Sequence, residues 1–388
     1  MTRADRLEEI ALRGLVRCYN PETRLFRAKL VETPDGIEPV GLSFRYSGMA
    51  AIGLCAAARR GLSDPALPLD RILSRLAETA LAGCDELDLA LVLWAHAVAD
   101  TGEVPALFAE VERTYRRHVG WYTCMGLSWS LAAVEHVVRL GSEVSARAAS
   151  LAEAMAADLG HYQHPRTALF AIRHRRVSRK LLDTLVEARV GTFANHSYAS
   201  YALSLYAART RDERAAACVR RCVEAVCGGQ GERGQWWWMV DTRTGRWVDR
   251  YPVYAVHQDA MAPFCLYAAR AFTKMEVAAH LRRGLDWLFG ENELGESLVD
   301  VDRDIIWRAI QRADSLSDGE YGVPENTLRR RRAVGLGLGF LANRWPLTER
   351  LVMLRESRSY HLGWVLFARE ALLAAESREP TPALRSGR

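Results

Sequence analysis

The chain has 388 residues, of which 49% are hydrophobic and 26% are charged. This composition supports a large packed core and excludes a disordered protein. The net charge of +5 arises from 52 basic and 47 acidic side chains, a balance that argues against a nucleic-acid-binding protein.

Targeting and cofactor signals are missing from the sequence. Residues 1–15 are charged and resemble an amphipathic helix rather than a signal peptide. The most apolar stretch, 87–99, is too short to span a bilayer and contains Asp88 and His96. The eight cysteines include no Cys-x-x-Cys pair, and no nucleotide-binding glycine motif occurs. We expect a cytoplasmic protein with reduced thiols, no metal, no cofactor and no stable membrane insertion.

Helical periodicity runs through the chain, and two kinds of helix alternate six times. Helices of the first kind are amphipathic with one charged side, and they are expected at 4–17, 68–82, 104–117, 142–158, 211–227 and 274–290. Helices of the second kind are apolar nearly all round, and they are expected at 44–59, 86–98, 125–139, 193–209, 256–271 and 358–376. A helix of the second kind must be buried on more than one side.

Six such pairs can bury their apolar faces only by stacking against one another. Closing the stack places the second kind of helix inside a ring of the first kind, which gives an all-α fold, the (α/α)6 toroid of six outer–inner helical hairpins. We predict one domain over residues 1–376 and a disordered tail over 377–388. One small β-hairpin is the only strand pattern that competes with the helices.

The lengths of the connections indicate where a functional site lies. The long segments all join an outer helix to the next inner helix, and they cover 18–43, 159–192, 228–255 and 291–357. In an up-and-down ring such segments emerge on one face, the rim at which the inner helices begin. Long ordered loops on a rigid scaffold usually build a binding site. The alternative is that these loops are ornamental.

Polar residues at the starts of three inner helices are candidates for this site. Arg45 and Tyr46 begin the first inner helix, and Arg358, Tyr360 and His361 begin the last. The arginines can bind an anionic ligand group or pair with rim carboxylates.

The fourth inner helix starts with a second set of candidates. Asn195 is a candidate N-cap and ligand contact, and His196 and Tyr198 are candidates for proton transfer. An Asn, His and Tyr set is also what a polysaccharide lyase would use beside a uronate carboxylate.

Aromatic residues are densest between residues 234 and 259. Two short strands are expected at Trp236–Val240 and Arg246–Asp249, joined by a turn at Thr244-Gly245. Flat aromatic faces stack on sugar rings, so we expect sugar contacts from this segment. The expected contacts are Trp236, Trp237, Trp238, Arg250, Tyr251 and Tyr254. The alternative is a small satellite core that attaches the hairpin to the rim.

Acid and base candidates lie in the next inner helix and in the acidic segment that follows it. We expect Asp259 to act as an acid/base carboxylate, His257 to transfer protons, and Gln258 to bind hydroxyl groups. Asp259 can instead stabilise the helix start. Glycoside cleavage needs two carboxyl groups, and the expected partners of Asp259 or Asp249 are Glu291, Glu293, Asp300 and Asp302. Further ligand contacts or carboxylates are expected at Glu291, Asn292, Asp300, Asp302, Trp307 and Arg308.

Several of these motifs together resemble a known group of proteins. The run Gly234–Trp238, the run Arg250–Pro263, Asn292–Gly295 and Ile306–Arg308 resemble uncharacterised bacterial six-hairpin toroid proteins that accompany exopolysaccharide genes. The resemblance extends over about residues 11–374. That group tends to have Phe-Ala-Asp-Gln where this chain has Phe193–His196, so an acid is replaced. Its wider toroid relatives include glycosidases, polysaccharide lyases, sugar epimerases and terpene cyclases.

These observations favour a carbohydrate-directed enzyme, either a glycoside hydrolase, a lyase or an epimerase, linked to polysaccharide metabolism. Its ligand would be an oligosaccharide, a polysaccharide or a glycosylated intermediate. A non-catalytic glycan-binding or assembly factor that contacts polysaccharide-synthesis proteins is the second hypothesis. The third is a terpene cyclase or prenyl-handling protein, although Asp300-Val-Asp302-Arg303 departs from the Asp-x-Asp-Asp motif of such cyclases.

Overall fold

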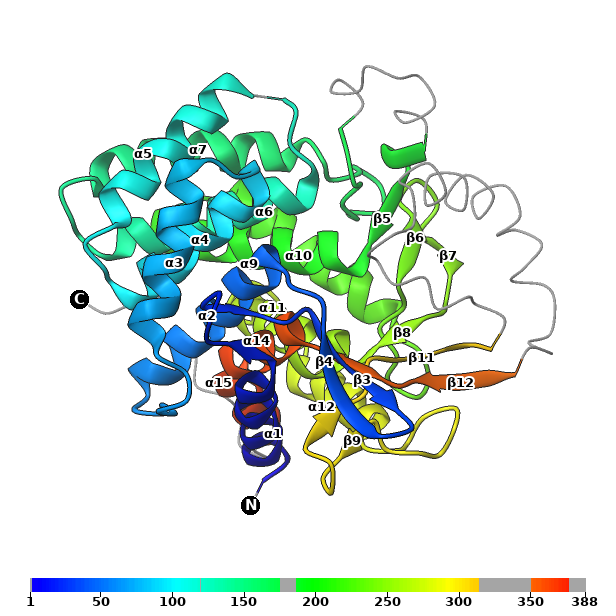
Figure 1. Cartoon of the computed structure of the whole chain (residues 1–388). Helices are drawn as coiled ribbons and strands as arrows, with labels where there is room; N and C mark the ends of the chain where they lie inside the picture. Colours follow the sequence, from blue (N-terminus) through cyan, green and yellow to red (C-terminus); the bar gives the residue numbers. More distant parts are fainter. Residues whose placement is uncertain (1, 119, 175–185, 314–349, 377–388) are drawn as a thin grey trace.

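The computed structural model describes residues 2–118, 120–174, 186–313 and 350–376, so the expected tail at 377–388 lies outside the described residues. The fold is an (α/α)6 toroid, as predicted, in which outer helices surround an inner ring (Figure 1). The inner ring consists of α2 (Phe44–Arg59), α4 (Glu86–Ala99), α6 (Cys124–Arg139), α9 (Phe193–Thr210), α11 (Ala262–Ala269) and α14 (Ser359–Phe367). From α2 to α11 each packs on the next, and α14 closes the ring against α2 on one side and against the turn that precedes α11 on the other.

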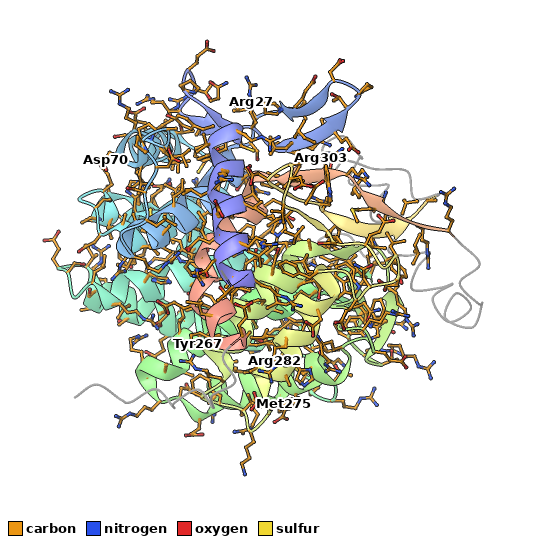
Figure 2. All side chains as sticks on the ribbon, turned by 90° about the horizontal axis from the view of Figure 1, so that it is seen from below. Arg27, Asp70, Tyr267, Met275, Arg282 and Arg303 are labelled. Carbon is orange, nitrogen blue, oxygen red and sulfur yellow. The ribbon has the colours of Figure 1, made fainter. Side chains whose placement is uncertain are left out.

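The outer helices are amphipathic and cover the ring from outside. They are α1 (Arg3–Cys18), α3 (Leu69–Ala82), α5 (Val104–Arg117), α7 (Ser145–Gly160), α10 (Glu213–Gly228) and α12 (Val277–Leu288). Figure 2 shows the polar side chains of the outer layer around the molecule, among them the exposed Asp70 on α3. No helix in the described ranges is long and apolar enough to cross a membrane.

Two inner helices differ from the continuous α-helices that were predicted. The fifth begins with a π-helical turn, η1 (His257–Met261), before α11. The sixth is divided into two helices, because the helix is interrupted by a turn at Ala368 and a new helix, α15 (Arg369–Glu376), follows. Arg369 then pairs with Glu8 and Asp5, which directs α15 toward α1.

The long rim segments contain more strands than the single hairpin that the sequence predicted. That hairpin is present as β6 (Met239–Asp241) and β7 (Arg246–Asp249), with β5 (Val190–Thr192) on the other edge of β6. There are two further three-stranded sheets. One consists of β3 (Lys29–Thr33), β4 (Gly36–Val40) and β13 (Glu356–Arg358). The other consists of β8 (Val253–Tyr254), β11 (Ala309–Arg312) and β12 (Leu351–Leu354). Short hairpins pair β1 (Tyr19–Asn20) with β2 (Leu25–Phe26), and β9 (Val299–Asp300) with β10 (Ile305–Ile306). The strands are short, and each three-stranded sheet includes a partner that is distant in sequence, so little local alternation marks them.

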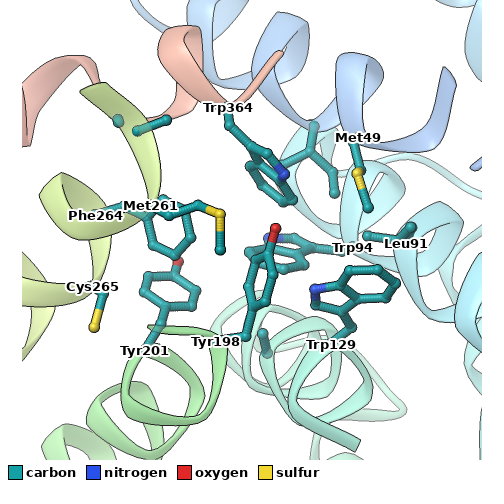
Figure 3. Packing of buried hydrophobic residues seen from close by; sticks show 14 of the residues in the cluster. Met49, Leu91, Trp94, Trp129, Tyr198, Tyr201, Met261, Phe264, Cys265 and Trp364 are labelled. Carbon is teal, nitrogen blue, oxygen red and sulfur yellow. The ribbon is translucent and has the colours of Figure 1, made fainter. Parts of the chain in front are cut away.

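Large aromatic side chains fill the centre of the inner ring (Figure 3). Trp94 of α4 stacks on Tyr201 of α9 with ring centroids 5.6 Å apart, and its ring lies 5.4 Å from that of Trp364 of α14. All three side chains are buried. Such contacts stabilise by area burial and by ring geometry, so the ring has a packed core rather than an open channel.

Candidate functional site

A cavity of about 350 Å³ lies where the inner helices begin. We call it the rim cavity. The first two turns of α2, α6, α9 and α14, together with η1, contribute most of its lining, and the rest comes from the long segments between helices. The lining residues are Arg45, Tyr46, Met49, Met125, Trp129, Ala194, Tyr198, Trp238, Tyr254, Val256, His257, Met261, Arg308 and Tyr360.

The local sequence fixes the helix starts around this cavity. Ser43, Thr123 and Thr192 are the N-caps of α2, α6 and α9, and each accepts a hydrogen bond from a backbone N–H in the first turn. A cap satisfies one of the N–H groups that have no partner within the helix. The caps therefore hold the helix ends that present the lining side chains.

Two pairs of aromatic rings line the rim cavity. Trp238 and Tyr254 meet edge to face with ring centroids 5.3 Å apart. The ring centroids of Tyr46 and Tyr360 lie 4.6 Å apart. Trp129 and Tyr198 connect the lining with the aromatic core. Burial raises the pKa of Tyr198 well above its ordinary value, so this phenol stays protonated.

His257 is the histidine in the lining of the rim cavity. Its ring stacks on Trp238 at 5.5 Å and lies 4.6 Å from Phe193. Nδ1 is 3.3 Å from the carbonyl oxygen of Trp236. Because a carbonyl can only accept, Nδ1 carries the hydrogen, and Nε2 is the nitrogen that can take up a proton from a neutral ring.

Two arginines line the rim cavity, and their surroundings differ. Arg45 pairs with two acids of α4 and its N-cap, Asp88 at 2.6 Å and Asp85. Arg308 lies 3.3 Å from Glu356 and stacks over Tyr254 at 4.9 Å. Arg308 is 6% exposed, so its guanidinium is held in one orientation.

Glu356 lies at the centre of a buried cluster of charges behind the cavity wall. Arg358 and Lys29 contact it at 2.8 and 2.7 Å, in addition to Arg308. Burial raises the pKa of Glu356, but Arg358 and Arg308 outweigh this effect and hold the pKa below its ordinary value. Arg358 also donates a hydrogen bond to the hydroxyl oxygen of Tyr46 at 2.8 Å. The cluster thus anchors two lining residues, Tyr46 and Arg308.

The rim cavity brings together eight of the residues that the sequence singled out. These are Arg45, Tyr46, Tyr198, Trp238, Tyr254, His257, Arg308 and Tyr360. They come from the first, fourth, fifth and sixth inner helices and from two rim segments. The connection lengths predicted a site at the rim where the inner helices begin, and the cavity lies at that rim.

Asp259 and His361 do not line the cavity. Asp259 is fully buried, and both carboxylate oxygens contact Nε2 of His361, at 2.8 and 2.9 Å. Burial raises the pKa of Asp259, whereas His361 opposes this shift. The pair links η1 to α14 inside the ring. Asp259 lies two residues after His257 and therefore faces another direction on the same turn.

Three other candidates are fixed inside helix starts. The N-cap of α9 is Thr192 rather than Asn195, and Asn195 completes a capping box by accepting from the Thr192 N–H at 3.0 Å. His196 accepts from the Phe170 N–H at 3.2 Å and is 1% exposed. Gln258 is fully buried beside Gly284.

The aromatic segment divides between the cavity and a satellite core. Trp236 is 1% exposed and packs on Phe193. Trp237 meets Tyr251 edge to face, and Arg250 stacks over Trp237. Of the three consecutive tryptophans, therefore, only Trp238 is in the cavity lining.

Glu293 holds this satellite core together instead of lining the cavity. Its carboxylate accepts hydrogen bonds from Gln235, Tyr251 and Trp287 at 2.8, 2.9 and 2.7 Å. A carboxylate bound in this way is committed to structure.

The remaining candidates also lie away from the cavity lining. The Asn292 side-chain amide donates to the Trp287 and Glu296 carbonyls, and Glu291 is exposed. Trp307 is buried under Arg355. Arg358 lies behind Tyr46. Asp249 ends β7, and its side chain lies outside the described part of the structure.

Sequence reasoning missed the methionines and the inner-helix tryptophan that line the cavity. Met49, Met125, Trp129 and Met261 line the cavity beside the aromatic walls. Each lies within the first two turns of an inner helix, which was the available signal. Because they are apolar, their residue types do not distinguish a cavity lining from the core.

Comparison with known proteins shows the fold class. No family model and no curated protein sequence matches the chain. Among solved structures, cellobiose 2-epimerase from Spirochaeta thermophila is similar with a TM-score of 0.61 and 12% identity, covering 94% of this chain and 93% of that one. An unsaturated glucuronyl hydrolase specific for heparin has a TM-score of 0.57 and 12% identity, with 95% and 97% covered. A sugar epimerase from a ruminal bacterium has a TM-score of 0.55 and 9% identity, with 74% and 86% covered. The chain therefore shares the six-hairpin (α/α)6-toroid fold of sugar epimerases and glycosidases.

Proposed function

We propose that this protein is a carbohydrate-active enzyme that moves a proton on a sugar bound in the rim cavity, by epimerisation or elimination. One observation carries the proposal: the aromatic-walled cavity contains His257, and no Asp or Glu is among its described lining residues. The expected ligand is an oligosaccharide, a polysaccharide or a glycosylated intermediate. Cytoplasmic polysaccharide metabolism, with contact to polysaccharide-synthesis proteins, is part of the same proposal.

The walls of the cavity suit a sugar ring. Axial C–H groups give a pyranose an apolar face that stacks on aromatic rings, and Trp238, Tyr254 and Trp129 offer such rings. Arginines and phenols at the same site can bind hydroxyl groups and fix the orientation of the ring. The volume is at the lower end of the range for ligand pockets, which favours a monosaccharide or disaccharide unit in the cavity.

His257 is the proposed base. Its Nδ1–H is held by the Trp236 carbonyl, so Nε2 can remove a proton from a carbon beside a carbonyl or carboxyl group of the sugar. In epimerisation a proton returns to the opposite face of the same carbon. In elimination a leaving group departs from the neighbouring carbon. Tyr198, which also lines the cavity, is a proposed proton donor for either step.

Hydrolysis by a pair of carboxylates receives less support. Such a reaction requires one carboxyl as acid and another as base or nucleophile at a defined separation. Asp259 is bound to His361, and Glu293 is bound to three donors outside the cavity. Asp300, which belongs to the run that departs from the terpene cyclase motif, lies in the β9–β10 hairpin and pairs with Arg303.

The test is turnover of a panel of neutral and uronate-containing oligosaccharides, read by mass spectrometry. We expect an isomerised or unsaturated product, and a fall of kcat by at least about 100-fold in His257→Asn. His118→Gln, on an exposed histidine at the end of α5, is the matched control and should retain full activity. Full turnover by His257→Asn would reject His257 as the base.

A non-catalytic glycan-binding protein is the second candidate. It is favoured by the same composition of the cavity, in which aromatic side chains and methionines outnumber titratable groups. This candidate predicts saturable binding of a glycan, loss of binding in Trp238→Ala, and no chemical change in any member of the panel. A product formed by the wild-type protein would exclude it.

A further inference from the structure

A second, much smaller cavity lies between the inner helices α9 and α11 and the outer helix α10. Its volume is about 10 Å³, and its ten lining residues are all buried, each with at most 5% of its surface exposed. We call it the interior cavity. A volume of about 10–15 Å³ suffices for one water molecule. The interior cavity therefore fits a single water and is too small for a sugar.

One face of α9 brings polar groups to the interior cavity. Phe193, His196, Ser197 and Ser200 follow one another at intervals of three, one and three residues, the spacing that places side chains on the same side of a helix. His196 and Ser200 are four residues apart, so they lie one above the other on that face. A single small molecule can contact both of them.

The ring of His196 presents a buried hydrogen-bond donor to the interior cavity. Its Nδ1 accepts from the Phe170 N–H at 3.2 Å, and burial lowers its pKa to about 3, so the ring is neutral and carries its hydrogen at Nε2. Nε2 is buried and has no hydrogen bond to any described residue. A buried N–H without an acceptor is costly, and folded proteins normally provide one.

The Ser200 hydroxyl is a second polar group of the same lining. Its Oγ is buried and makes no hydrogen bond of normal geometry to a described residue. Its polar neighbours are the thiols of Cys222 and Cys265, which are weak partners. Ser204, one turn further along α9, instead donates to the carbonyl four residues before it at 2.6 Å. Ser200 makes no such bond, so its hydroxyl is available to a molecule in the interior cavity.

We propose that the interior cavity binds one water molecule, which accepts a hydrogen bond from the Nε2–H of His196 and donates one to Oγ of Ser200. An ordered buried water has about two to four polar partners. Ser197, in the same lining, provides a further hydroxyl for the second hydrogen of the water. His196, which the sequence marks as a candidate for proton transfer, thus becomes a residue that binds water inside the protein.

The proposed water lies behind the side chains that hold His257. Phe193 and Trp236 line the interior cavity, and both also contact His257. The Phe193 ring lies 4.6 Å from the His257 ring, and the Trp236 carbonyl is the partner of Nδ1. A water in the interior cavity would therefore support the packing of these two residues. The inference concerns the protein interior and does not depend on whether His257 is a base.

The test combines a crystal structure of the full chain, at a resolution that shows ordered waters, with NMR in solution. We expect one density peak within hydrogen-bonding distance of both His196 Nε2 and Ser200 Oγ. In solution, a nuclear Overhauser effect should connect the His196 Nε2 proton with water protons.

His96 is the matched control for the NMR measurement. It is as buried as His196, with 1% exposed, but its ring nitrogens contact the Thr101 hydroxyl and the Leu73 carbonyl at 2.6 and 3.2 Å. Both nitrogens thus have partners within the protein. The ring N–H of His96 should show no effect to water.

Ser200→Ala tests the second partner of the water. It should weaken or abolish both the density peak and the Overhauser effect at His196. Ser204→Ala is the control, because Ser204 is not a lining residue of the interior cavity, and it should leave both signals unchanged. Melting curves of each variant check that it is folded.

Three results would overturn the inference. The first is an interior cavity without a density peak, in a map that shows waters elsewhere inside the protein. The second is a hydrogen on Nδ1 instead of Nε2 of His196, as reported by the nitrogen-15 chemical shifts of the ring. The third is a peak and an Overhauser effect that are unchanged in Ser200→Ala. Xenon bound in the interior cavity under pressure would support the first result, because it would show a dry cavity.

Discussion

Replacement of Glu356 by Gln tests whether the buried charge cluster holds the cavity wall in place. The carboxylate contacts Arg358, Arg308 and Lys29 and is 7% exposed. Gln is similar in shape and keeps one acceptor oxygen, but it removes the negative charge. Three cations then remain close together in a weakly screened environment.

The expected loss follows from the burial of this cluster. Removal of one partner from a buried ion pair costs about 3–5 kcal/mol, and the remaining Gln oxygen places the estimate near 3 kcal/mol. An unfolding entropy of about 2.1 cal/mol/K per residue gives about 0.8 kcal/mol/K for 388 residues. The melting temperature should therefore fall by about 4 °C. Urea unfolding followed by circular dichroism and differential scanning calorimetry measure the two quantities.

Glu32→Gln is the matched control for this experiment. Glu32 also contacts two arginines, Arg303 and Arg355, but 31% of its side chain is exposed. Its loss should cost less than about 1 kcal/mol. The reasoning is refuted if Glu356→Gln changes the unfolding free energy by less than about 1 kcal/mol, or if both variants lose the same amount.

Two further predictions concern packing and pH. Gly53→Ala should destabilise the protein by about 1–3 kcal/mol in urea unfolding, because its Cβ would lie 2.0 Å from the Gly363 carbonyl oxygen where α2 crosses α14. Gly102→Ala, where no atom lies within 4 Å of the added Cβ, should be within about 0.5 kcal/mol of wild type. Burial lowers the pKa of His196 to about 3, so below about pH 6.5 the unfolded chain takes up a proton that the folded chain does not, and stability falls as pH falls. His196→Asn should flatten this fall in urea midpoints between pH 7 and pH 4 relative to His118→Gln, and an identical slope would contradict the assignment.

The helical ring could be predicted from sequence because its signals are local. Periodicity identified the range of α2 to the residue, and the predicted ends of α4, α6 and α9 are within one residue of the structure. Apart from the β6–β7 hairpin, the strands were missed because they are short, and because the three-stranded sheets also use partners far away in sequence. For example, Lys29 pairs with Arg358 across β3 and β13. Such strands are short, and the contacts that stabilise them belong to the tertiary fold.

The location of the site was easier to predict than its residues. Loop lengths indicated the rim, and His257, Trp238 and Arg308 are indeed among the lining residues. Asp259 could not be distinguished from His257 by pattern, because both lie in the same π-helical turn and face different directions. The alternation of three tryptophans likewise did not reveal that Trp236 and Trp237 are buried in a satellite core.

The most direct test of the central claim is incubation of the wild-type protein and His257→Asn with the sugar panel in D2O. If His257 removes a proton from carbon, an epimerised product acquires one solvent deuterium at that carbon in the wild-type reaction. An unsaturated product instead forms more slowly from substrate deuterated at that carbon, with a primary isotope effect. His257→Asn should show neither signal. A hydrolysed product that contains no carbon-bound deuterium, and that His257→Asn forms equally well, would contradict the proposed proton transfer.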